Sequence, residues 1–189
     1  MVLVAWGELM ANGPAYLKDL KAYDAGEPTV ADLAAMEKEF YAEGDRACGI
    51  LMGSLVENAL ETAITQIMRR GVSRSDIFGF NGPAGSFSAK ITLAYGLGIY
   101  RSKTKHDLNL IRELRNKFAH CRRPIRFETD VTKAVCDHLR LPDIDLKSIQ
   151  IRDSNDPKER FIVTCQKITF HLLHFAHTAR PYQQASQLP

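Results

Sequence analysis

The stretch TKHDLNLIRELRNKFAH, residues 104–120, carries the clearest structural pattern in this chain. Its apolar side chains recur every three or four positions and so share one face of a helix: Leu110, Ile111, Leu114 and Phe118. The polar side chains fall on the other face: Asn109, Arg112, Glu113, Asn116 and His120. This pattern predicts an amphipathic helix that buries one side in a protein core. We expect Thr104 to cap its N-terminus and Pro124 to lie beyond its end.

The same helical period recurs on both sides of this stretch. Further helices are predicted over residues 29–40, 45–70, 86–98, 129–139 and 158–178, with a short helical turn that begins at Ser73. The helix over 45–70 is expected to face the core with Ile50, Leu51, Leu55, Ala59, Ala63 and Ile67. Ser86 and Asp156 are the expected caps of two helices, and Pro157 suits a first helical position. Because the alternation typical of strands is nearly absent, the fold class is all-α, a bundle of about five to seven helices.

Length and composition suit one domain with a single core, since the chain has 189 residues and a hydrophobic content of 45%. Glycines and prolines mark residues 1–28 as a loosely held arm. Residues 29–180 form the predicted helical domain, and residues 181–189 form a flexible tail. No apolar run has the features of a signal peptide or the length of a membrane span. We therefore expect a cytoplasmic protein with no membrane partner.

Neither the cysteines nor the histidines form a metal-binding pattern. The four cysteines lie far apart with no Cys-x-x-Cys pair, which favours free, reduced thiols. His171, His174 and His177 recur every third residue, but ligands at that spacing drift around a helix, so we interpret them as a structural or solvated stripe. The glycines do not match a phosphate-binding loop. We expect no metal and no cofactor.

Positive charge gathers at the end of the central helix, although the net charge of the whole chain is only +3. Between residues 112 and 126, one acidic residue, Glu113, stands among six basic ones: Arg112, Arg115, Lys117, Arg122, Arg123 and Arg126. Such a cluster favours a phosphate-bearing or otherwise acidic partner, either a protein, RNA or DNA. The alternative is a solvated helix face whose cations suit the negative end of the helix dipole.

Two motifs on these helices resemble the mannitol operon repressor (MltR) family. They are FSAKITLAYGLGI at residues 87–99 and RNKFAH at residues 115–120, with Asp107-Leu108 and Ile111-Arg112 between them. The resemblance covers roughly residues 45–140. It implies an all-helical regulatory protein that is linked to transcriptional control and lacks an obvious helix-turn-helix reader. The sequence shows no such reader either, so we expect the basic helix end to bind the partner.

Arg115, Asn116 and His120 also resemble the signature of HEPN domains, many of which are metal-independent ribonucleases that act as dimers. The resemblance implies that Arg115 stabilises the phosphate, Asn116 orients groups at the site and His120 transfers the proton. On an ideal helix Arg115 and His120 point about 140° apart, so their convergence needs a distorted last turn or a second protomer. A Glu-x-x-x-Lys partner motif is missing, because Glu57 is followed four positions later by Glu61.

Three hypotheses about function follow from these patterns. The leading one is a non-enzymatic regulator that binds protein or nucleic acid through residues 112–126. The second is a HEPN-like endoribonuclease, of toxin or defence type, that uses Arg115 and His120. The third is a catalytically inactive HEPN-like module that only dimerises. The second and third both predict a homodimer.

Overall fold

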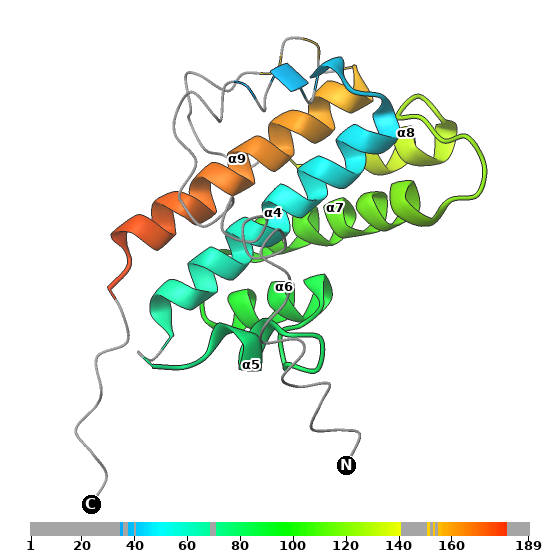
Figure 1. Cartoon of the computed structure of the whole chain (residues 1–189). Coiled ribbons are helices and arrows are strands. Elements are labelled where there is room, and N and C mark those ends of the chain that lie inside the picture. Colours follow the sequence, from blue (N-terminus) through cyan, green and yellow to red (C-terminus); the bar gives the residue numbers. More distant parts are fainter. Residues whose placement is uncertain are drawn as a thin grey trace, which may run out of the picture. The chain divides into compact units, whose positions relative to one another are not determined.

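The computed structural model describes residues 35, 38–39, 41–68, 71–140, 151, 153 and 155–180, and within them it holds six helices and no strand (Figure 1). The helices are α4 (Asp45–Ile67), α5 (Arg74–Phe78), α6 (Phe87–Gly96), α7 (Ser102–His120), α8 (Asp130–Asp137) and α9 (Pro157–Thr178). The prediction of an all-α fold is confirmed. The chain divides into two compact units, Met1–Glu39 and Phe40–Pro189, and all six helices belong to the second.

Helix α4 is the central helix of this unit, because α6, α7 and α9 all pack against it. Figure 1 shows α9 running alongside α4. The first turns of these two helices lie together, since Lys158 Nζ donates to the carbonyl O of Glu43 at 2.8 Å and lies 3.6 Å from Asp45 Oδ1. By length and composition alone α4 could also cross a membrane, and half of its most apolar window is buried in the bundle.

Two glycines on α4 allow α7 to approach closely. A Cβ atom at Gly49 would lie 2.3 Å from Phe118 Cδ2, and one at Gly53 would lie 2.6 Å from Arg115 Cγ. Both distances are shorter than the 3.0 Å below which real Cβ contacts essentially never occur. The side chains of Phe118 and Arg115 therefore lie directly against the α4 backbone.

Phe118 anchors the buried face of α7 in an aromatic cluster. Its ring centroid lies 4.6 Å from that of Phe127, and the Phe127 centroid lies 5.1 Å from that of Phe161 on α9. All three side chains are fully buried. The inner face predicted for this helix is confirmed except at Leu110, which is only half-buried.

Local capping signals predicted two helix starts correctly. Ser86 Oγ accepts a hydrogen bond from Ala89 N at 3.2 Å at the start of α6. Asp156 Oδ1 accepts from Lys158 N at 2.8 Å at the start of α9. The predicted start of α7 was wrong: the backbone leaves the extended conformation after Arg101, so Thr104 lies inside the first turn and no side chain caps the helix.

The inner face predicted for α4 was partly wrong. Leu51 is 40% exposed, and Ile50, Leu55 and Ile67 are only half-buried. Apolar residues surround much of this helix, so its hydrophobic pattern does not decide which side faces inward. The packing of α6, α7 and α9 against it decides it, and the buried side carries Cys48, Gly49, Met52, Gly53, Val56, Ala59, Leu60, Ala63 and Ile64.

Some predictions concern residues outside the described ranges. These are the arm over residues 1–28, most of the helix that begins at Thr29 and the tail over residues 181–189.

Candidate functional site

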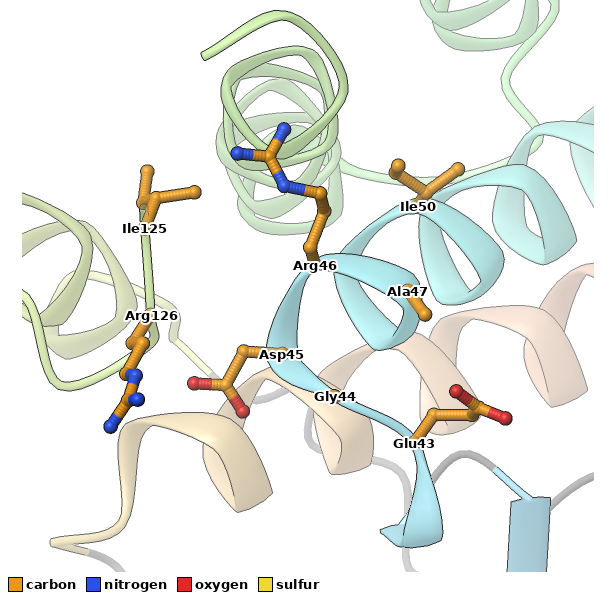
Figure 2. Close-up of a pocket in the computed structure, with 8 residues that line it drawn as sticks. All are labelled: Glu43, Gly44, Asp45, Arg46, Ala47, Ile50, Ile125 and Arg126. Atoms are coloured by element: carbon orange, nitrogen blue, oxygen red, sulfur yellow. The ribbon is translucent and has the colours of Figure 1, made fainter. Parts of the chain in front are cut away.

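Arg46, on the first turn of α4, holds the C-terminal end of α7. Its Nη1 donates to the carbonyl O of Phe118 at 2.6 Å, and its Nη2 donates to the carbonyl O atoms of Cys121 at 2.9 Å and Arg123 at 3.0 Å. The last carbonyls of a helix lack intrahelical partners and carry partial negative charge, so a guanidinium group stabilises them in both respects. Figure 2 shows the Arg46 side chain rising from α4 toward the neighbouring green helix.

The segment that Arg46 holds continues into a second anchor. We call residues 117–126 the basic turn; it comprises the last turn of α7 and the residues that follow. Asp45 Oδ2 accepts from Phe127 N at 2.9 Å, just beyond the basic turn. Thr132 Oγ1, on α8, donates to the carbonyl O of Arg126 at 2.6 Å. The backbone of the basic turn is therefore fixed from both ends by side chains of α4 and α8.

The basic turn holds the uncompensated positive charge of this region. Its basic side chains are exposed, and within the described part of the chain none of them forms an ion pair: Lys117, Arg122, Arg123 and Arg126. The other two predicted cations are neutralised, because Arg112 pairs with Glu113 and Arg115 pairs with Glu57. The six predicted basic residues thus fall into a paired set on α7 and a free set on the turn.

Arg115 and Asn116 lie together, whereas His120 stands apart from them. Arg115 Nη1 donates to Asn116 Oδ1 at 3.1 Å, and Nη2 donates to Glu57 Oε2 at 3.2 Å. The Arg115 side chain is 29% exposed. His120 is exposed, and no hydrogen bond joins it to any other residue that the structure describes. Because α7 stays helical through His120, no distortion of the last turn brings its imidazole toward Arg115.

A buried lysine completes a charge network around Glu57. Lys90 Nζ, on α6, lies 3.0 Å from Glu57 Oε1 and 3.0 Å from Glu61 Oε2, and the lysine side chain is only 8% exposed. Arg74 Nη2 lies 2.8 Å from Glu61 Oε1 on the outer side of the network. A lysine thus reaches Glu57 from α6, and the position four residues after Glu57 on α4 is Glu61. The network connects Arg115 through Glu57 to three helices.

Sequence reasoning missed Lys90, although one signal was present. It is the single charged residue within the mostly apolar run FSAKITLAYGLGI, and a lysine on a buried face nearly always has a carboxylate partner. Burial acts to raise the pKa of Glu61, but hydrogen bonds from Arg74 and Lys90 outweigh this effect and lower the pKa from its ordinary value. Glu61 is therefore ionised at neutral pH.

An open groove of about 760 Å³ lies beside Arg46 at the start of α4 (Figure 2). Its lining consists of Glu43, Gly44, Asp45, Arg46, Ala47, Ile50, Ile125 and Arg126. Figure 2 shows the Arg126 side chain at one edge of the groove. Since both signs of charge line the groove, it does not by itself select an anion or a cation.

The remaining candidate residues lack the grouping that metal chemistry needs. Among the described residues, no three metal-binding side chains come together. Cys48 and Cys136 are buried free thiols whose pKa burial raises to about 12, so they stay protonated near neutrality. Burial lowers the pKa of His171 from its ordinary value, and the charge of His174 lowers it further. His171 is therefore mostly neutral at physiological pH.

No protein-family model, no curated protein and no solved structure matches this chain. The resemblances to the mannitol operon repressor family and to HEPN domains therefore stay predictions.

Proposed function

We propose that this chain is a cytoplasmic helical regulatory protein that binds nucleic acid through the basic turn. One observation carries the proposal: the basic turn presents four exposed cations, none of them ion-paired with a residue that the structure describes, on a backbone that Arg46 and Asp45 hold in place. Nucleic-acid affinity comes largely from cations that neutralise backbone phosphates and release their counterions. A role in transcriptional control, as the mannitol operon repressor resemblance implies, would use such a surface.

The simpler explanation of these cations is that they stabilise the C-terminal end of α7. Arg46 already stabilises this end, because its guanidinium group donates hydrogen bonds to the carbonyl O atoms of Phe118 and Cys121. Arg122 and Arg123 make no side-chain hydrogen bond to another described residue. Their charges are thus not needed to cap the helix, which supports a role toward an outside partner.

The chemistry of the basic turn favours phosphates over bases. The exposed large hydrophobic side chains of the described residues all lie outside residues 117–126, and Phe118 is fully buried. The turn exposes no Phe, Tyr or Trp ring, so only the His120 imidazole and the arginine guanidinium planes are left to stack on unpaired bases, which is a main source of affinity for single strands. We therefore expect contact with the backbone of a duplex and little dependence on base sequence.

A binding titration tests this proposal. Fluorescence anisotropy of a short labelled duplex is measured with the wild-type protein and with the double variant R122E/R123E, which we expect to bind at least about tenfold more weakly. The matched control is R101E/R180E, which changes the net charge equally at two other exposed arginines. The control should bind nearly as well as the wild type.

Two results would overturn the proposal. Equal loss of affinity in both double variants would mean that binding depends on total charge and not on the basic turn. A wild-type protein that binds neither duplex DNA nor RNA would remove nucleic acid as the partner and leave an acidic protein surface as the ligand of the basic turn.

A metal-independent endoribonuclease is the second candidate, and the observations that favour it are the exposure of His120 and the contact between Arg115 and Asn116. His120 would transfer the proton and Arg115 would stabilise the phosphate. Since α7 is regular up to His120, the two groups would have to come from different protomers. The ion pair to Glu57 works against this role, because it neutralises part of the Arg115 charge.

Incubation with RNA in excess chelator separates the two candidates. Our leading proposal predicts no cleavage. Cleavage by the wild type that His120→Ala abolishes would instead support the ribonuclease. Sizing at high protein concentration adds a second criterion, because a strict monomer would exclude both the dimeric ribonuclease and an inactive dimerising module.

A further inference from the structure

The three hydrogen bonds of Arg46 span the point at which α7 ends. The carbonyl of Phe118 belongs to the last helical turn, whereas the carbonyls of Cys121 and Arg123 follow the helix. The Cys121 carbonyl belongs to the peptide unit that precedes Arg122, and the Arg123 carbonyl belongs to the unit that follows Arg123. One guanidinium group therefore fixes the backbone on both sides of this arginine pair.

We propose that Arg46 is a positioning residue for nucleic-acid binding: it sets the backbone of residues 121–123 so that Arg122 and Arg123 meet the phosphates together. This inference rests on the proposed function. Arg46 contacts the turn from α4, which is 72 to 77 residues away in sequence, and its own Nη atoms are engaged with carbonyls. It acts through the turn and not by touching the ligand.

Electrostatics explain why the turn needs such a residue. Arg122 and Arg123 are adjacent cations without counter-ions in the described structure, so they repel each other and favour a more extended chain. Charge-assisted bonds from Arg46 oppose this repulsion and reduce the ordering that binding would otherwise require. A lysine cannot replace the planar fork of the guanidinium group, whose two terminal nitrogens reach three acceptors at once.

The test compares Arg46→Lys and Arg46→Met with the control Arg101→Lys, which makes the same exchange at an exposed arginine elsewhere. Duplex affinity is measured by anisotropy at several salt concentrations, and amide hydrogen exchange is measured over residues 118–126. We expect both Arg46 variants to bind about tenfold more weakly with an unchanged salt dependence, because the phosphate-contacting cations remain. We also expect faster exchange in the turn, whereas R101K should match the wild type.

Arg46→Lys retains the charge and the aliphatic stem, so it serves as the milder variant if the methionine variant unfolds. Wild-type affinity in R46K would overturn the positioning role, whether or not exchange in the turn becomes faster. A decreased salt dependence would also overturn it, because Arg46 would then be a direct phosphate contact. If the wild type binds no nucleic acid, the proposed function fails first, and the exchange data still report whether Arg46 orders the turn.

Discussion

Replacing Gly49 with alanine should destabilise the protein, although alanine favours helices more than glycine does. The new Cβ atom would lie 2.3 Å from Phe118 Cδ2 and 2.7 Å from Phe118 Cγ. The ring cannot move aside easily, because it is fully buried and its centroid lies 4.6 Å from that of Phe127. Helix α7 would therefore have to move away from α4.

The size of the effect follows from two opposing contributions. Overpacking a core by a methyl group costs about 1–3 kcal/mol. Replacing glycine by alanine inside a helix contributes about 1 kcal/mol in the other direction. We expect the clash to outweigh the gain at Gly49, where the contact is far inside normal van der Waals distance, with a net loss of up to about 2 kcal/mol in the free energy of unfolding.

Urea denaturation followed by circular dichroism measures this loss. The matched control is Gly96→Ala, the last residue of α6, where an added Cβ atom meets nothing within 4 Å. That variant should be as stable as the wild type or up to about 1 kcal/mol more stable. If G49A is as stable as G96A, the close approach of α4 and α7 at Phe118 is wrong.

Three further predictions concern stability. Phe118→Ala should cost about 3–5 kcal/mol as a truncation in the core, and a loss below about 1 kcal/mol in a denaturation curve would mean that α7 buries another face. Asp156→Ala should cost about 1 kcal/mol, because the carboxylate that caps α9 is lost; thermal unfolding against the wild type checks this. The pKa of Glu61 is lowered in the folded state, so the ionised carboxylate stabilises the fold fully at pH values above its ordinary pKa of 4.5. This stabilisation is lost as the pH falls through the lower pKa that Glu61 has in the folded state. The stability difference between the wild type and Glu61→Gln should therefore narrow in acid, and a difference that is constant with pH would contradict the ion pairs with Arg74 and Lys90.

The positions of most helices could be predicted because their signals are local. The caps Ser86 and Asp156 lie within three residues of the amides that they bind, and the apolar period of α7 identifies its buried face. The same approach failed on α4, where the pattern is apolar on several sides. There the inward face depends on Gly49 and Gly53, whose importance appears only when the side chains of α7 are placed against them.

The sequence predicted which charged residues make up the candidate site, but it did not predict which of them form ion pairs. Sequence alone identified the arginines of the basic turn, but it could not separate Arg122, which forms no ion pair with a described residue, from the paired Arg115. That distinction depends on Glu57, which is 58 residues away in sequence. The hydrogen bonds from Arg46 to the end of α7 could not be predicted for the same reason, because a helix end and the side chain that caps it can come from distant segments.

The salt dependence of duplex binding tests the central claim most directly, namely that the four exposed cations of the basic turn contact phosphates. Four such contacts predict that the logarithm of the association constant falls with the logarithm of the salt concentration with a slope of about −3.6. Replacing Arg122 and Arg123 with glutamine should reduce the magnitude of that slope by about 1.8. A slope near zero, or one that this double substitution leaves unchanged, would contradict the claim.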